Sequence, residues 1–161
     1  MAELAVAMSL QFTSVLDKFH KSELEELLFF HPHQGRFASS IVGAVEKHGV
    51  PTVVEQDNHL RVKLVGSDDA QTLYVVMESL LLQELVGAVI YTRTSEGTLV
   101  ILHIAVKKEY TQEGEKSGQQ VTLQLIQEIC RIARQVQGIK SVQLGYKRSH
   151  NFLKTDLFRV S

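Results

Sequence analysis

The chain has 161 residues, of which 44% are hydrophobic and 22% are charged, a composition typical of an ordinary globular domain. Seventeen Lys and Arg residues nearly balance eighteen Asp and Glu residues, for a formal net charge of -1. An overall electrostatic attraction to nucleic acid or to an anionic membrane is therefore excluded as a basis of function. Any anion site must be local, and we expect one domain over residues 1–161.

Cysteine content and hydropathy exclude further classes of protein. A single cysteine, Cys130, excludes a disulfide framework and a cysteine-rich metal site. No apolar stretch reaches the roughly 18 residues that a membrane span needs, and the run Ala5–Met8 is too short for the core of a signal peptide. We expect a cytoplasmic protein that binds neither nucleic acid nor membrane.

The first 50 residues predict two helices. Ser22 and Glu25 have the spacing of a capping box, and three leucines follow on one face, which predicts a short amphipathic helix over 22–30. Helical spacing of apolar residues from Phe37 to His48 predicts the second helix. Between them, the loop carries a His-x-His pair for which the sequence offers no third metal ligand, so we expect no metal site.

From residue 52 onward, the spacing of apolar residues changes from helical to strand-like. Residues 52–64 alternate apolar and charged positions around a turn, which predicts a hairpin with one wet face at a sheet edge. Three further strands are predicted at 73–77, 85–91 and 99–106, and the last two are apolar enough to be central. Apolar residues three or four apart then predict a long helix through Val121, Leu125, Ile129, Ile132 and Val136, closed by Gly138.

A last strand at 141–146 completes an α/β fold with a mixed, mostly antiparallel sheet and a long crossover helix. The apolar strand ending Leu102–His103–Ile104–Ala105–Val106, a Tyr four residues later, a glycine-containing loop, a long helix and a final strand resemble the core of the GNAT superfamily of N-acetyltransferases. The resemblance covers about Leu73 to Tyr146. It implies acetyl-CoA as co-substrate, with its pyrophosphate at the loop and helix N-terminus and its pantetheine along the strand ending at Val106.

The loop departs from the family motif, which has Gln or Arg, two variable residues, Gly, one variable residue, and Gly or Ala. One register puts Gly114 at the first glycine and Lys116 at the second position. The register that we prefer inserts two residues, so that Gly118 is the second glycine and Lys116 replaces the first. The resemblance then implies a set of cofactor-binding residues: Ile104, Ala105, Val106, Thr111, Gly114, Lys116, Ser117, Gly118 and Asn151.

The C-terminal segment also departs from the family, because no Tyr follows Asn151 at the place of the usual general acid. Tyr146, at the end of the last strand, is the remaining candidate, although packing at a strand end explains it as well. His103 is the only titratable side chain in the most apolar strand and is the candidate base for removing a proton from an amine. A buried histidine bonded to backbone is the alternative.

Three functions stay open at this point. The first is an acetyl-CoA-dependent N-acetyltransferase acting on an unidentified amine. The second is a catalytically inactive GNAT-fold module that binds a ligand or another protein, and the third is a structural domain that oligomerises through a sheet edge. A homodimer formed by strand exchange near the C-terminus is compatible with each of them.

Overall fold

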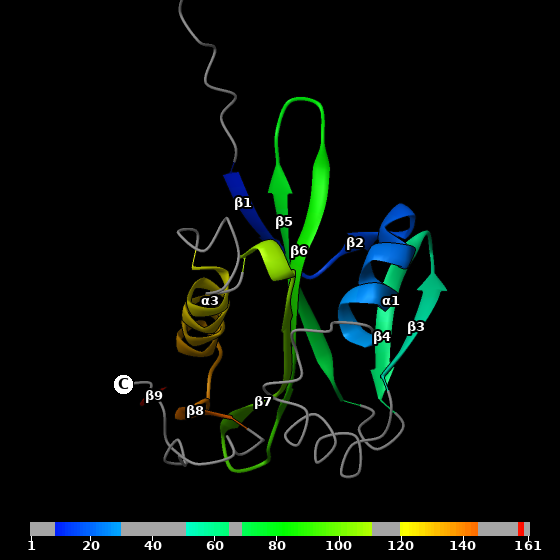
Figure 1. Cartoon of the computed structure of the whole chain (residues 1–161). Helices are drawn as coiled ribbons and strands as arrows, with labels where there is room; N and C mark the ends of the chain where they lie inside the picture. The colour runs from blue at the N-terminus through cyan, green and yellow to red at the C-terminus, as the bar shows by residue number, and fades with distance from the viewer. Residues whose placement is uncertain (1–8, 30–50, 65–68, 111–119, 145–157, 160–161) are drawn as a thin grey trace, which may run out of the picture.

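The computed structural model describes residues 9–29, 51–64, 69–110, 120–144 and 158–159 (Figure 1). Its strands are β1 (Ser9–Thr13), β2 (Leu16–Asp17), β3 (Pro51–Gln56), β4 (His59–Leu64), β5 (Gln71–Glu78), β6 (Gln83–Arg93), β7 (Thr98–Val106), β8 (Ser141–Leu144) and β9 (Phe158–Arg159). Its helices are the 3-10 helices η1 (Lys18–His20) and η3 (Lys108–Tyr110) and the α-helices α1 (Lys21–Phe29) and α3 (Val121–Gln135).

The main sheet has six strands in the order β1-β5-β6-β7-β8-β9. Only β7 and β8 are parallel, with Thr98 opposite Ser141 and Ile101 opposite Leu144, and the other neighbours are antiparallel. Helix α3 connects the parallel pair, as a parallel connection requires. The predicted mixed, mostly antiparallel sheet with a long crossover helix is confirmed.

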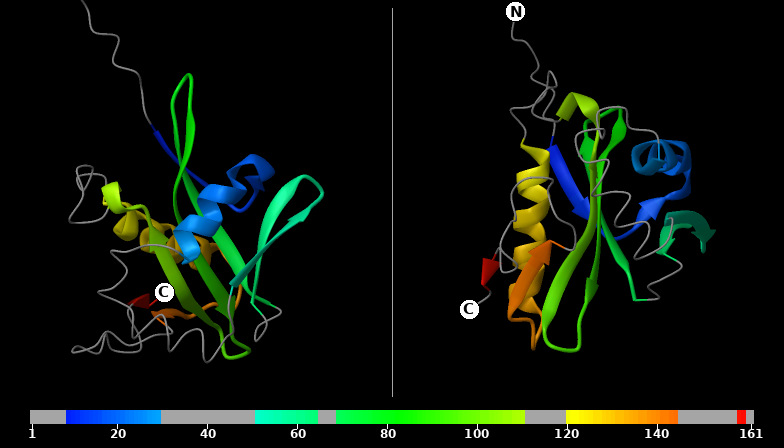
Figure 2. Two further views of the ribbon diagram at one scale, coloured as in Figure 1. Left: turned by 45° about the vertical axis from the view of Figure 1, so that its right-hand side comes forward. Right: turned by 60° about the horizontal axis from the view of Figure 1, so that its bottom comes forward.

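Two layers cover the sheet (Figures 1 and 2). Helix α3 lies on one face, while α1 and a second sheet, in the order β2-β4-β3, lie on the other. Helix α3 packs on the sheet through apolar residues that the helical spacing predicted, since Val121, Leu125 and Ile129 are fully buried. Val136 lies beyond the helix in extended backbone and is exposed, so the prediction that it belongs to the helical face was wrong.

Helix α1 confirms the first predicted helix, with Leu24, Leu27 and Leu28 buried against the second sheet and the opposing face of the main sheet. Its start differs from the predicted capping box. The 3-10 helix η1 precedes it, and there the Asp17 carboxylate accepts from the Phe19 N–H at 3.1 Å. The helical segment therefore begins four residues before Ser22, because Asp17 satisfies an N–H donor that would otherwise lack a partner.

The predicted hairpin is formed by β3 and β4, whose turn residues Asp57 and Asn58 both have positive φ. Alternate residues of β4 are buried, as the pattern indicated. Its place was predicted only in part, because the hairpin belongs to the second sheet and not to an edge of the main sheet. Strand β1, which pairs with β5, was not predicted, and the predicted helix at 37–48 lies outside the described residues.

None of the helices in the described part of the chain is both long and apolar enough to cross a bilayer. Within the same ranges, no group of three or more His, Cys, Asp or Glu side chains is placed to hold a metal ion.

Candidate functional site

A β-bulge in β7 decides which way its side chains point. Ile90 pairs with His103 and Tyr91 pairs with Ile101, so Leu102 has no opposite residue on β6. Paired residues of an antiparallel sheet project to the same face, and Ile90 and Leu102 belong to the core under α1. His103 therefore lies on the α1 face, while Ile104 packs against the core under α3. The extra residue reverses the alternation that a regular strand would have.

The second half of β7 extends beyond the described part of its parallel neighbour. Strand β8 pairs with Thr98–Ile101 and its described part ends at Leu144. Over Leu102–Val106, the strand neighbour of β7 within the described ranges is β6 alone. This is the segment along which the resemblance places pantetheine. Ala105 and Val106 are buried there and Ile104 is half-buried.

The N-terminus of α3 lies at the same end of the molecule as the end of β7 (Figure 1). Gln120 precedes the helix in left-handed backbone, with φ of 49°, and its side chain does not cap the helix. The first turn carries no acidic residue. An N-terminus of this kind presents backbone N–H donors and the positive end of the helix dipole, the groups that favour a bound anion.

The His103 ring is half-buried, and its Nε2 atom is fully buried without a hydrogen-bond partner in the described structure. Burial lowers the pKa of His103 to about 4, because the charged imidazolium is poorly solvated there. The ring is therefore neutral at pH 7. A buried ring nitrogen without a partner costs free energy unless a ligand or water satisfies it.

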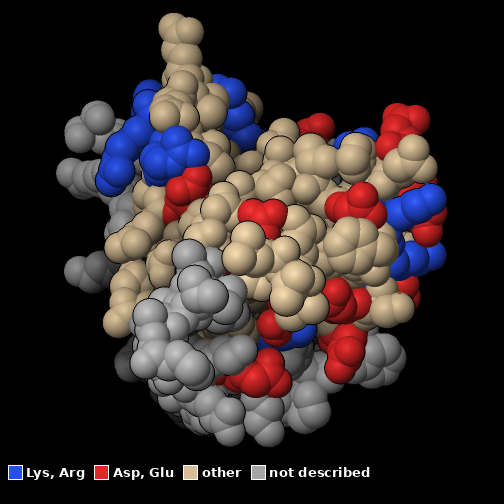
Figure 3. Space-filling model, turned by 90° about the horizontal axis from the view of Figure 1, so that it is seen from above, with Lys and Arg blue, Asp and Glu red and all other residues tan. Residues whose placement is uncertain are grey.

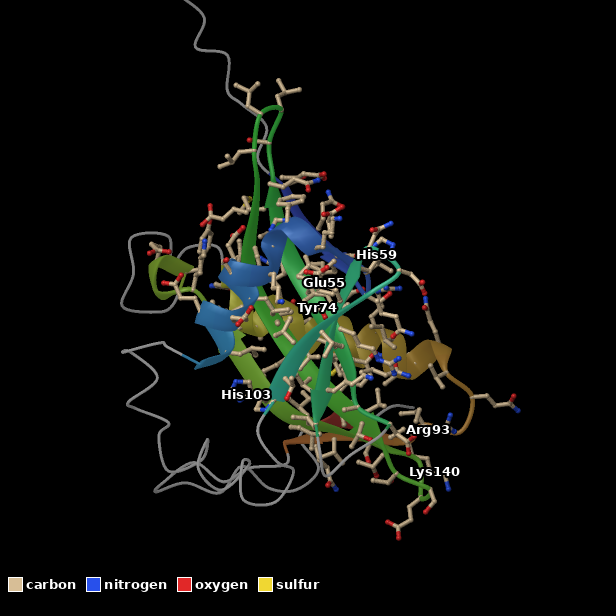
Figure 4. All side chains as sticks on the ribbon, turned by 90° about the vertical axis from the view of Figure 1, so that its right-hand side faces the viewer. Glu55, His59, Tyr74, Arg93, His103 and Lys140 are labelled. Atoms are coloured by element: carbon tan, nitrogen blue, oxygen red, sulfur yellow. The ribbon has the colours of Figure 1, made fainter. Side chains whose placement is uncertain are left out.

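Tyr74, which comes from β5, is a second titratable side chain on this face and is fully buried. Burial raises the pKa of Tyr74 to about 12, an effect that a hydrogen bond with Thr72 and the charge of Arg61 only partly offset. Strand β6 separates β5 from β7, and Figure 4 shows Tyr74 and His103 at different places on the face. Tyr74 is a poor proton donor at neutral pH.

An ionic cluster fastens α1 to the ends of β6 and β7. The Glu23 carboxylate accepts from the Leu85 N–H at 3.1 Å, and its other oxygen lies 2.9 Å from His20 Nδ1. Lys107 Nζ lies 3.1 Å from Glu84 and 3.5 Å from Glu23. Burial opposes the charge of Lys107, but the two carboxylates outweigh it and raise its pKa. The cluster fixes the backbone where β7 ends.

Sequence reasoning missed this cluster. Glu23 and Leu85 are 62 residues apart, so no local spacing could reveal the hydrogen bond. The remaining predicted site residues lie outside the described residues: Thr111, Gly114, Lys116, Ser117, Gly118, Tyr146 and Asn151. The structure therefore places His103 and Ile104–Val106 on one strand. The His103 ring lies on the α1 face of the sheet, whereas the neighbouring Ile104 side chain packs against the core under α3.

No family model and no curated protein matches the sequence. Among solved structures, five chains match. One of them, titled "Crystal structure of Nourseothricin acetyltransferase", shares 15% sequence identity, with 86% of this chain and 72% of that chain covered and a TM-score of 0.35. A likeness at that TM-score does not establish a family.

Proposed function

We propose that the protein is an acetyl-CoA-dependent N-acetyltransferase acting on an amine. The observation that carries this proposal is the β7-α3-β8 unit, in which β7 extends past the described part of β8 and ends beside a helix N-terminus without a side-chain cap from Gln120. A thioester carrying a long chain and a diphosphate suits such a place, because the strand offers backbone groups and the helix end favours the anion.

The residues present fit this co-substrate in three respects. The first-turn N–H groups of α3 would hold the diphosphate together with the loop 111–118, where Lys116 adds a cation. Backbone groups of Ile104–Val106 would orient the acyl carbonyl. The Glu23 and Lys107 cluster supports that backbone, since Lys107 follows Val106 directly and its N–H donates to the Val86 carbonyl at 2.8 Å.

His103 is the proposed base. Its neutral ring can accept a proton when the nitrogen of an attacking amine bonds to the acyl carbon and its N–H becomes acidic. The leaving thiolate takes a proton in turn, and Tyr146 is the proposed donor. A pKa of about 4 makes His103 a weak base, so the proton transfer depends on the acidity that the amine gains during attack.

An assay of acetyl-CoA turnover with a panel of amines tests this function, and release of the free thiol is the quantity measured. We expect His103→Gln to lower kcat by about 10²- to 10⁴-fold while acetyl-CoA affinity stays the same. Gln127→Ala, a change at an exposed position in the middle of α3, is the control and should leave kcat unchanged. Unaltered turnover in His103→Gln would remove His103 from the mechanism.

The sequence of the loop supports one alternative, an inactive module that keeps the ligand site. Glu113 and Glu115 bring negative charge toward the expected diphosphate, and no Tyr follows Asn151. Acetyl-CoA binding without thiol release across the whole amine panel would favour this alternative over the enzyme.

A further inference from the structure

The side chains around His103 limit the kind of amine that can react there. Ile90, which pairs with His103, is buried with Leu102 and Ala105 in the core under α1. Thr72 on β5 pairs in turn with Ile90, and paired residues project to the same face of the sheet. The row that crosses β5, β6 and β7 therefore offers an acceptor an apolar surface, a hydroxyl and an imidazole, but no charged group.

Two carboxylates lie at the end of β7, and both are bound to other groups. Glu84 lies 3.1 Å from Lys107 Nζ, and Glu23 lies 3.5 Å from the same atom. Glu23 also accepts from the Leu85 N–H at 3.1 Å and lies 2.9 Å from His20 Nδ1. Because Lys107 already supplies a positive charge to both carboxylates, an ammonium ion would have to displace it in order to bind them.

Carboxylates on the outer surface do not serve the ring. Glu55 is exposed, lies 3.9 Å from Lys21 Nζ, and is placed away from His103 in Figure 4. Seen from above, Asp and Glu side chains are scattered over the surface together with Lys and Arg (Figure 3). Water and salt screen charges in such positions, so they offer little to a cation that is held beside a buried ring.

A positive charge is unfavourable on the face under α1. Burial lowers the pKa of His103 to about 4, and none of the described carboxylates offsets this effect. Arg61 adds positive charge at another place on this face, where it partly offsets the raised pKa of Tyr74. The burial that disfavours a charged His103 ring would also lower the pKa of an ammonium group bound beside it.

Proton transfer separates two classes of acceptor. An alkylammonium ion has a pKa close to that of a lysine side chain, about 10.4, so its nitrogen must lose a proton before it can attack. A base as weak as His103 removes that proton inefficiently. A weakly basic amine is neutral at pH 7 and arrives with its lone pair free. Its nitrogen bonds to the acyl carbon as the C–S bond breaks, its proton passes to His103, and the leaving thiolate is protonated.

We propose that the acceptor is a weakly basic amine that is neutral at pH 7, such as an aromatic amine or an alkylamine with electron-withdrawing groups. This acceptor class rests on the acetyltransferase function proposed above. The apolar row beside His103 suits an uncharged acceptor, and the carboxylates of Glu23 and Glu84 are held by Lys107. An acceptor that carries an ammonium group would lose its hydration there without gaining a counter-charge from the described residues.

Two matched pairs of small amines test this preference through thiol release from acetyl-CoA at pH 7. Trifluoroethylamine and ethylamine are close in size, and only the first is neutral at this pH. The isomers p-toluidine and benzylamine form an aromatic pair with the same difference in charge. We expect kcat/KM, expressed per total amine, to be at least about tenfold higher for the neutral member of each pair.

The variant His103→Gln should lower thiol release with both neutral amines, which ties the preference to this site. Unchanged release in this variant overturns the assignment of the acceptor class to His103. Release in which ethylamine and benzylamine match or exceed their neutral partners also overturns it, and the acetyltransferase function then stands with a cationic acceptor. Absence of thiol release with all four amines, together with absence of acetyl-CoA binding to folded protein, overturns the acetyltransferase function itself.

Discussion

The two faces of the main sheet differ in the chemistry that they bury. Under α3 lies a core of mostly apolar side chains, with Tyr91, Tyr110 and Cys130 also buried in it. Val121, Leu125 and Ile129 meet the sheet there, and Gly87 allows close approach. A Cβ atom on Gly87 would lie 3.3 Å from Leu125 and 3.0 Å from the Ala105 carbonyl. This face has the dense packing of a structural core.

The face under α1 buries groups that can titrate. His103, Tyr74 and His20 all lie on it or beside it, and the Glu23 and Lys107 cluster closes its edge. The comparison teaches that the His103 ring and the Glu23 and Lys107 cluster lie on one side of the sheet, whereas the titratable groups buried on the other side are tyrosines and a cysteine. Strand β7 contributes to both faces, because its bulge turns His103 to the face under α1, here called the chemical face, while Ile104 packs against the core under α3.

The largest effect is expected on the apolar face. Ile129→Ala should lower the free energy of unfolding by about 2 to 5 kcal/mol, since it leaves a cavity at a fully buried position under the helix. Urea denaturation measures this loss. Leu123→Ala, on the exposed side of the same helix, is the control and should cost much less. Similar losses in the free energy of unfolding for both variants would mean that Ile129 is not buried between α3 and the sheet.

The opposite face should depend on pH through His103. Its pKa of about 4 lies below the ordinary 6.5, so the unfolded chain binds the proton first as the pH falls. The native state then loses stability from about pH 6.5 down to about pH 4, by up to about 3 kcal/mol.

Urea denaturation of the wild type and of His103→Leu checks this dependence. We expect the wild type to lose more stability than the variant between pH 7 and pH 4. Measurement at pH 8, where the ring is neutral in both states, gives the baseline difference that is due to packing alone. Parallel pH profiles for the two proteins would show that His103 is not buried as described.

A smaller effect is expected at the edge of the chemical face. Glu23→Ala should cost about 1 to 2 kcal/mol, because the Leu85 N–H loses its acceptor and Lys107 loses one carboxylate. Glu23→Gln keeps an acceptor and should cost less. Glu26→Ala, at an exposed position of the same helix, is the control and should stay within about 0.5 kcal/mol of the wild type. Equal losses of stability in Glu23→Ala and Glu26→Ala would mean that the contacts of Glu23 do not stabilise the fold.

The apolar face could be predicted well from the sequence, and the reason is local. Helical spacing alone identified Val121, Leu125 and Ile129, and uninterrupted apolar runs identified the central strands. Strand β1 was missed, because its five residues carry a weak pattern and the residues with which they pair on β5 lie 61 to 69 positions away, from Thr13 with Tyr74 to Ser9 with Glu78. Such pairing depends on contacts that no short window contains.

The chemical face could be predicted only in part. His103 stood out as the one titratable residue in an apolar strand, but simple alternation from Ile101 would put it under α3. The bulge at Leu102 puts it under α1, and an apolar sequence gives no local sign of a bulge at that residue. The hydrogen bond from Leu85 to Glu23 was unpredictable for the same reason as β1, because it joins distant segments.

Titration calorimetry with acetyl-CoA tests the proposed site most directly. We expect a saturable isotherm and a raised melting temperature, because a ligand that binds only the native state stabilises it. Lys116→Glu should weaken both signals by placing a like charge near phosphate, and Gly118→Val should abolish them if this glycine permits close backbone approach. No heat and no change in melting temperature at millimolar acetyl-CoA, with folded wild-type protein, would contradict the acetyltransferase proposal.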